Sequence, residues 1–498
     1  MVIQPLPMLS KSRFTAGLQC LKRLHFECYE PRLAPPVSDG QQAIFDTGTA
    51  IGVLARDLYP SGVLVDDDHL HHDEAVARTA TLLADTTVSA IFEAAFTEDD
   101  VRVRVDLLVR SHQGWELIEV KGSSSVKQQY IDDVAIQLWT LERAGLHIRS
   151  ASVAHINRDY VYLGGEYDPS GLFAVEDVTT DARERLVEIP AELRTMRSAL
   201  GSGGAPDIDP GPHCFRPYTC EFVEYCHRDA VEWPVTELPA IRPARVQALL
   251  EGGQRSILDL TEAEPLSDLQ RRVRDVVRSG QPFIGPLLEN ALRQLQPPIH
   301  FVDFETVAPA LPVYAGTRPF ETLPFQWSDH VWDAAGNVSH FEFLADGSED
   351  PRTAFVTSLL DQLHGAGTIV VYSGYEGFQL RRLAIALPTL RPAIEAAAAL
   401  HWVDLLQVVR AHYYHRDFRG SFSLKSVLPV LVPTLGYQDL AIQEGATAAR
   451  TFLESLQPDL PLGARSELRN NLLAYCSRDT EATLEIVRAL TRLVAAAR

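Results

Sequence analysis

Alternating apolar and polar residues predict a mixed α/β structure in the first half of the chain. Residues 90–110 (AIFEAAFTEDDVRVRVDLLVR) alternate with a period of two, as strands do because successive side chains point to opposite faces. Residues 112–115 (HQGW) predict a turn, and residues 116–122 (ELIEVKG) predict a second strand. A helical pattern covers residues 128–145, and Gly145 predicts its end.

The second half has its own α/β pattern, which starts at residue 298. Residues 299–306 (IHFVDFET) follow two prolines and predict a strand, and residues 367–376 (GTIVVYSGYE) predict another buried strand. The pattern of residues 233–297 predicts mainly helices, and we interpret this segment as a connector. We therefore predict an α/β protein with domains at 1–232 and 298–498, joined by that helical connector.

Length and charge narrow the range of functions. At 498 residues the chain is too long for one hydrophobic core. Its net charge of −21 argues against a broad nucleic-acid coat, because such binding rests on Lys and Arg neutralising phosphates. A local basic groove is still compatible with that charge. The predicted connector carries four arginines in one helix that can contact phosphates: Arg271, Arg272, Arg274 and Arg278.

The N-terminal sequence MVIQPLPMLSKSRF has no apolar core of the kind found in signal peptides. The chain also lacks a run of eighteen or more apolar residues, so we predict no transmembrane helix. We expect a cytoplasmic protein without a membrane partner. In that compartment a cysteine cluster favours a metal or iron–sulfur site over disulfides.

Two carboxylates and one ammonium group are predicted to converge in the first half. Glu119 and Lys121 are two positions apart on a predicted strand and therefore share a face, and Asp106 lies on the preceding strand. The predicted helix that follows directs Gln137 back toward them, and Glu93 lies one strand earlier as a further ligand. Such carboxylates bind Mg²⁺ or Mn²⁺ and suit phosphodiester hydrolysis. A salt-bridged surface hairpin is the alternative.

This half resembles the RecB-like PD-(D/E)xK nucleases that carry an iron–sulfur cluster. The resemblance spans about residues 9–228 and implies a restriction-endonuclease-like fold with a nuclease site. Two features depart from the family pattern: residues 45–60 (FDTGTAIGVLARDLYP) contain no histidine, and the cysteine spacing is wider than usual. The matching order along the chain is Cys20, Asp106, Glu119, Lys121, Gln137, Cys214, Cys220 and Cys226.

The cysteines of HCFRPYTCEFVEYC (213–226) have the spacing C-x5-C-x5-C. With Cys20, four thiolates can hold a [4Fe–4S] cluster, which would tie the N-terminal segment to the end of the domain. Zinc, with His213 or His227 as ligands, and simple packing are the alternatives, and Cys28 competes with Cys20 as the fourth ligand. We interpret Cys476 as a small core residue.

A second group of acids is predicted in the C-terminal half. Asp303 and Glu305 share one face of a strand, and Tyr475 and Asp479 share one face of a helix. Glu376 begins a helix directly after a buried strand. Four acids of this kind can hold two metal ions that stabilise the attacking and leaving oxygens of a phosphoryl transfer. Tyr475 would orient the attacking water.

These motifs are similar to the DnaQ-like (DEDD) 3′–5′ exonucleases of the ribonuclease H fold, in their tyrosine variant. The resemblance covers about residues 298–498, and Asp404 and Lys425 also match its middle region. The family normally has Asp in the second motif, where this chain has Glu376; Asp404 is the alternative ligand. Together the two halves resemble a bacterial family that fuses a RecB-like nuclease to a ribonuclease H-like domain.

The resemblances imply a DNA-processing nuclease of repair, recombination or defence. Its implied cofactors are a 4Fe–4S cluster and Mg²⁺ or Mn²⁺, and its implied partner is DNA. RNA is the alternative polymer, since DnaQ-like domains act on both. A nucleic-acid-binding scaffold with one or both sites degenerate is the alternative of another class.

Overall fold

The computed structural model describes residues 6–68, 70–228 and 231–496, and it is a mixed α/β structure. The chain forms two compact units. The first comprises residues 1–230 together with the short segment 310–320, and the second comprises residues 231–309 and 321–498. Residues 233–297, predicted as a connector, are thus grouped with the second unit.

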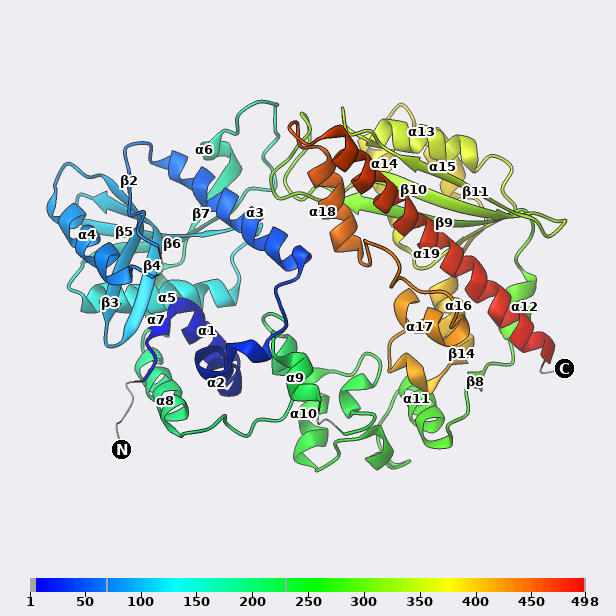
Figure 1. Ribbon diagram of the computed structural model, residues 1–498, viewed down its shortest axis with the longest axis horizontal. Helices are drawn as coiled ribbons and strands as arrows, with labels where there is room; N and C mark the ends of the chain where they lie inside the picture. The colour runs from blue at the N-terminus through cyan, green and yellow to red at the C-terminus, as the bar shows by residue number, and fades with distance from the viewer. Residues whose placement is uncertain (1–5, 69, 229–230, 497–498) are drawn as a thin grey trace. The chain divides into compact units, whose positions relative to one another are not determined.

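The first unit is built on a sheet with the strand order β2-β3-β4-β5-β6-β7, and β1 pairs with β4 in parallel (Figure 1). The alternating segment 90–110 forms β3 and β4, and the chain turns between them at Asp99 and Asp100, whose φ angles are 46° and 59°. The strands are β1 (Leu9–Ser10), β2 (Val63–Leu64), β3 (Ala90–Glu98), β4 (Val101–Ser111), β5 (Gly114–Lys121), β6 (Ile148–Ile156) and β7 (Phe173–Asp177).

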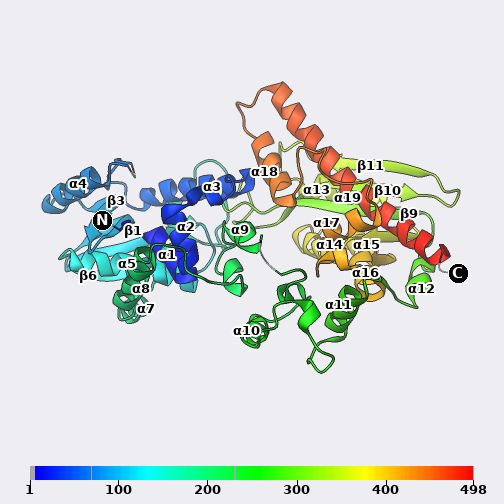
Figure 2. The same ribbon diagram turned by 60° about the horizontal axis from the view of Figure 1, so that its bottom comes forward.

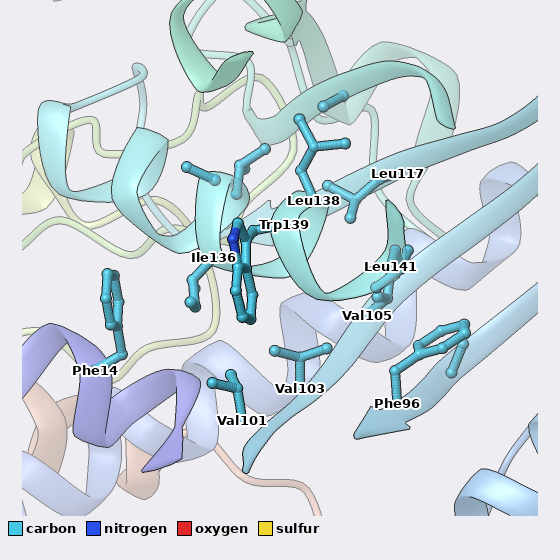
Figure 3. Packing of buried hydrophobic residues seen from close by; sticks show 14 of the residues in the cluster. Phe14, Phe96, Val101, Val103, Val105, Leu117, Ile136, Leu138, Trp139 and Leu141 are labelled. Carbon is cyan, nitrogen blue, oxygen red and sulfur yellow. The ribbon is translucent and has the colours of Figure 1, made fainter. Parts of the chain in front are cut away.

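Helices cover both faces of this sheet. Figure 3 shows Val103 of β4 and Trp139 of α5 in the larger buried cluster, between the strand and the helix. Ile51 of α3 belongs to a second buried cluster, with Ile118 of β5. The helices are α1 (Lys11–Gln19), α2 (Leu21–Tyr29), α3 (Asp39–Ala55), α4 (His72–Ala84), α5 (Gln128–Arg143), α6 (Pro169–Leu172), α7 (Thr179–Arg185), α8 (Ile189–Gly201) and α9 (Val223–His227).

The second unit contains a sheet with the order β11-β10-β9-β12-β13. β10 runs antiparallel to β9 and β11, whereas β12 runs parallel to β9 and β13. A short pair, β14 and β8, is separate from this sheet. The strands are β8 (Phe283–Ile284), β9 (Ile299–Val307), β10 (Leu323–Trp332), β11 (Val338–Leu344), β12 (Thr368–Val371), β13 (Trp402–Asp404) and β14 (Tyr413–Tyr414).

The long helix α19 lies along β9 and β10, as Figures 1 and 2 show. The opposite face of β9 packs on α13, where the rings of Phe304 and Phe355 are 5.0 Å apart. The helices are α10 (Pro243–Glu251), α11 (Asp268–Ser279), α12 (Leu288–Arg293), α13 (Arg352–Gln362), α14 (Tyr375–Ala386), α15 (Arg391–Ala398), α16 (Leu405–His412), α17 (Leu424–Leu431), α18 (Gly445–Ser455) and α19 (Leu462–Ala496).

The four arginines predicted to share a helix all lie on α11, and protein groups bind each of their side chains. Arg274 is buried and donates to the Thr261 carbonyl at 2.8 Å. Arg272 donates to the Arg410 carbonyl at 2.8 Å and lies over the Phe283 ring. Arg271 and Arg278 also donate to backbone carbonyls. These contacts stabilise the second unit.

Among the described residues, no helix is both long enough and apolar enough to cross a membrane.

Candidate functional sites

Strand β5 brings Glu119 and Lys121 to one face of the sheet, as the period of two predicts. The Glu119 side chain is only 2% exposed, and its Oε1 atom accepts a hydrogen bond from Lys121 Nζ at 2.8 Å. Gln137 on α5 donates to Glu119 Oε2 at 2.7 Å, so the predicted helix does direct this amide back to the strand. Three of the predicted residues therefore meet around one buried carboxylate.

Asp106 lies beside this group on β4. Its Oδ2 atom accepts a hydrogen bond from the Val120 amide at 2.7 Å. Burial, and then the negative charge of Glu119, raises the pKa of Asp106. Burial opposes the charged form of Glu119 as well, but the ammonium groups of Lys11 and Lys121 outweigh it and lower the pKa of Glu119. The charge of Glu119 thus acts on Asp106 from the adjacent strand.

Glu93 is the predicted additional ligand, and it lies on β3. Its side chain is 33% exposed and forms an ion pair with Arg56, whose Nη2 atom is 3.5 Å from Oε1. The φ angle of Glu93 is 57°, in the left-handed region that non-glycine residues rarely adopt. Glu93 and Asp106 both lie between the cross-strand pairs Phe92–Leu107 and Ala94–Val105, and the negative charge of Glu93 contributes to the raised pKa of Asp106.

Four predicted cysteines surround one cavity of the first unit: Cys20, Cys214, Cys220 and Cys226. Cys20 is the residue between α1 and α2, and the other three come from the segment predicted to complete the cluster. Cys28, the competing ligand, packs instead against the larger hydrophobic cluster of the first unit. The structure therefore brings Cys20 to the cysteine cavity and places Cys28 elsewhere.

His213 lies between two of these thiols. The Cys214 Sγ atom is 3.7 Å from His213 Nε2 and accepts from the Gly211 amide at 3.4 Å. Burial raises the pKa of a thiol, but hydrogen bonds from His213 and His227 lower the pKa of Cys214 to about 6. The His213 hydrogen bond also lowers the pKa of Cys20 against the effect of burial. The pKa values of Cys20 and Cys214 are thus lowered, whereas burial raises the pKa of Cys220 to about 11 and also raises that of Cys226.

The cavity offers four thiols, which are donors that both zinc and iron–sulfur clusters use. A single tetrahedral Zn²⁺, with Zn–S bonds of about 2.3 Å, would need its four sulfurs roughly 4 Å apart. Among the described residues, these cysteines do not form a group whose ligand atoms all lie within 4.8 Å of one another. The spacing of the four sulfurs is therefore wider than one tetrahedral Zn²⁺ requires.

In the second unit, the predicted acids gather where β9 meets α19. Asp303, Glu305 and Cys476 offer ligand atoms that all lie within 4.8 Å of one another. The Cys476 Sγ atom is 3.8 Å from Asp303 Oδ2, so this buried thiol borders the acids as well as the core. Burial, followed by the negative charge of Asp479, raises the pKa values of Asp303 and Glu305.

Asp479 completes the group from one face of α19. It is 8% exposed, and its Oδ1 atom accepts a hydrogen bond from the Tyr437 hydroxyl. The Tyr475 hydroxyl also bonds to Asp479, as the spacing of four residues allows. Burial, and then the charge of Asp479, raises the pKa of Tyr475, so this phenol stays protonated and can donate.

Glu376 is the second residue of α14 and is 2% exposed. Its Oε2 atom has no hydrogen-bond partner within the described part of the chain. Burial raises the pKa of Glu376, and the negative charge of Glu376 in turn raises the pKa values of Asp303 and Glu305. Asp404, the alternative ligand, caps α16 by accepting from the Gln407 amide at 3.1 Å.

An open cleft of the second unit leads to these acids. Its lining includes Asp303, Asp479 and Tyr475, together with Lys425 and Arg410. The Lys425 ammonium lies 5.8 Å from the centre of the Tyr475 ring, and its positive charge offsets part of the rise that burial causes in the pKa values of Asp479 and Glu305. The cleft thus combines carboxylates with cationic side chains.

Residues 300–423 match a family model described as a domain of unknown function, DUF2779. The match includes Asp303, Glu305, Glu376 and Asp404 and ends before Asp479. No curated protein matches the chain. A solved structure described as "Crystal structure of SSO0001" is similar at 12% identity over 41% of this chain and 81% of that chain. Its TM-score is 0.21, too low to support an argument about the fold.

Sequence reasoning missed three polar residues that contact these sites. Asp133 accepts from Lys121 at 2.5 Å and lies four positions before Gln137 on α5, so helical spacing could have identified it. Lys11 and Tyr437 reach their partners from 108 and 42 positions away, respectively. No local pattern indicates contacts of that kind.

Proposed function

We propose that the protein is a metal-dependent nuclease that hydrolyses phosphodiester bonds in DNA and has one site in each unit. The crowding of Asp303, Glu305, Glu376 and Asp479 in the second unit is the observation that carries this proposal. Among the described residues, none of these carboxylates forms an ion pair, and burial raises the pKa of each. Buried carboxylates that repel one another are neutralised by a proton or by a cation, and divalent ions prefer oxygen ligands.

In the second unit, Asp303, Glu305 and Asp479 would hold the ion. A bound Mg²⁺ or Mn²⁺ supplies a nucleophilic water and neutralises charge on the phosphate. Tyr475 keeps its proton and can orient the attacking water as a hydrogen-bond donor, while Tyr437 fixes Asp479. Lys425 lines the same cleft and can attract the phosphate backbone. This arrangement supports the DnaQ-like part of the proposal.

In the first unit, Asp106 and Glu119 would hold the ion, and Glu93 would add a ligand on leaving its ion pair with Arg56. Lys121 is fixed by two carboxylates, Glu119 and Asp133, and would stabilise the charge that develops on the phosphate. Gln137 orients Glu119. This convergence supports the RecB-like part of the proposal.

The cysteine cavity would hold a [4Fe–4S] cluster that closes the first unit. Its ligands would be Cys20 near the N-terminus and Cys214, Cys220 and Cys226 at the end of the unit. Gln19, next to Cys20, already donates to the backbone carbonyls of His213 and Tyr218 at 2.7 and 2.8 Å. The cluster would reinforce this junction by closing a loop of almost the whole unit, which is a structural role.

Cleavage assays of the anaerobically purified protein test this proposal. Labelled single- and double-stranded DNA and RNA are offered with Mn²⁺, with Mg²⁺, or with EDTA. The expected result is cleavage of DNA that depends on the divalent ion. If the protein cleaves RNA but not DNA, RNA replaces DNA as the proposed substrate. Failure to cleave any polymer with either ion would refute the nuclease proposal in favour of a scaffold.

A further inference from the structure

The carboxylate of Glu119 accepts hydrogen bonds from three donors. Its Oε1 atom accepts from Lys11 Nζ at 2.6 Å and from Lys121 Nζ at 2.8 Å, and its Oε2 atom accepts from Gln137 Nε2 at 2.7 Å. A carboxylate oxygen has two lone-pair sites, so Oε1 is fully used. An ion that binds this oxygen must therefore replace one of the two ammonium groups.

The two lysines differ in what else they bind. Lys121 Nζ also donates to Asp133 Oδ2 at 2.5 Å, and this second partner would hold it in place. Lys11 bonds to no other acceptor within the described part of the chain. Lys11 therefore loses a single hydrogen bond when it leaves Glu119, and it is the donor that an arriving ion displaces most easily.

The backbone around Lys11 is fixed, so only its side chain is free to move. Lys11 is the first residue of α1, and the strand before it, β1, pairs with β4. Gln19 at the other end of α1 donates to the backbone carbonyls of His213 and Tyr218. The Lys11 side chain is 22% exposed and has four rotatable bonds, so its ammonium can swing toward solvent while the helix stays in place.

We propose that Lys11 is a positioning residue of the first-unit site: its ammonium occupies the Oε1 atom of Glu119 in the metal-free protein and moves off when a divalent ion binds that atom. The proposal rests on the proposed function, since it requires an ion at Glu119. After displacement the ammonium stays beside the site, where it can contact the phosphate of a nucleic acid. Before the ion arrives, the positive charge of Lys11 thereby balances the negative charge of the buried Glu119.

Mn²⁺ binding in the absence of nucleic acid tests this inference. The full-length protein carries Asp303→Asn to weaken the second site, and free Mn²⁺ is measured by electron paramagnetic resonance. Lys11→Met should bind Mn²⁺ about fivefold more tightly than its parent, because one competing ion pair is lost. Lys11→Gln, which keeps a donor but no charge, should fall between the two. Lys127→Met is the matched control, since Lys127 is exposed and does not contact Glu119.

Unchanged or weaker binding in both Lys11 variants, with circular dichroism like that of the parent, would overturn the inference. Glu119→Gln separates this failure from a failure of the proposed function. If Glu119→Gln abolishes the Mn²⁺ site while the Lys11 variants bind like the parent, only the role of Lys11 is wrong. If Glu119→Gln binds Mn²⁺ like the parent, the first-unit metal site itself is wrong.

Discussion

The Tyr437 hydroxyl donates a hydrogen bond to Asp479 Oδ1 across 42 positions of the sequence. Tyr437 is 8% exposed, and the Lys425 ammonium lies 5.5 Å from the centre of its ring. Asp479 also bonds to Tyr475, so two phenols fix one carboxylate that would ligate the ion. Tyr437 thus acts through Asp479, whereas Tyr475 lines the cleft itself.

Tyr437→Phe should therefore weaken the second-unit site without removing a ligand. A lost hydrogen bond to a charged group is worth about 1.5–3 kcal/mol, which corresponds to a loss of roughly tenfold or more in Mn²⁺ affinity. The measurement is a Mn²⁺ titration of cleavage in a Lys121→Met background. Excess Mn²⁺ should restore the rate of Tyr437→Phe but not that of Tyr475→Phe, and equal behaviour of the two variants would contradict this division of roles.

Asp303→Asn should stabilise the metal-free protein, because burial and the neighbouring carboxylates oppose the ionisation of Asp303 and an Asn side chain does not ionise. A gain of about 1 kcal/mol corresponds to roughly 2–4 °C in the melting temperature of a domain of this size. Differential scanning calorimetry with EDTA measures it. Added Mn²⁺ should then raise the melting temperature of the wild-type second unit but not that of Asp303→Asn.

Asp459→Asn is the matched control for this experiment. Asp459 is exposed, so removal of its charge does not remove the cost of a buried charge. A lower melting temperature for Asp303→Asn than for the wild type in EDTA would show that the acids are not in mutual repulsion.

Cys20→Ser should lose the iron and sulfide of the proposed cluster, and Cys28→Ser should keep them. The physical reason is that Cys20 lines the cavity with the other three cysteines, whereas Cys28 packs in the hydrophobic cluster. Iron and sulfide analysis of anaerobically purified variants measures the difference. The reverse result, or one zinc per chain in the wild type, would rule out this ligand set.

His330 should make the second unit less stable in acid. Its pKa is lowered to about 4 by burial and by the neighbouring His340, and its Nδ1 atom is 2.8 Å from Thr480 Oγ1. An unfolded His titrates near 6.5, so the unfolded chain takes up the proton first. The contribution of His330 to stability is therefore complete above pH 6.5 and is lost as the pH falls toward 4.

Urea unfolding at pH 7 and pH 5 checks this effect by comparing the wild type with His330→Asn. The other titrating groups are the same in both proteins, so their effects cancel when the two changes in unfolding free energy are subtracted. These groups include the metal-site acids, whose raised pKa values change stability with pH in the opposite direction. The wild type should lose more stability than the variant between the two pH values. An equal loss in both proteins would mean that His330 does not titrate in this way.

Local periodicity accounted for the parts of these sites that lie within single elements. The alternation of a strand placed Glu119 beside Lys121 and Asp303 beside Glu305, and helical spacing placed Tyr475 above Asp479. The same reasoning could not find Lys11, because its contact with Glu119 depends on how α1 packs against the sheet. The same reasoning also missed the thiol of Cys476 beside Asp303, because a cysteine among apolar residues of a helix is predicted to be a core residue.

The cleavage of labelled double- and single-stranded DNA by site variants tests the central proposal most directly. Lys121→Met, Asp303→Asn and the double variant are compared with the wild type in Mn²⁺, at equal iron content and equal folding by circular dichroism. We predict that each single variant loses one part of the cleavage and that the double variant loses all of it. A double variant that cleaves DNA at the wild-type rate would contradict both site assignments.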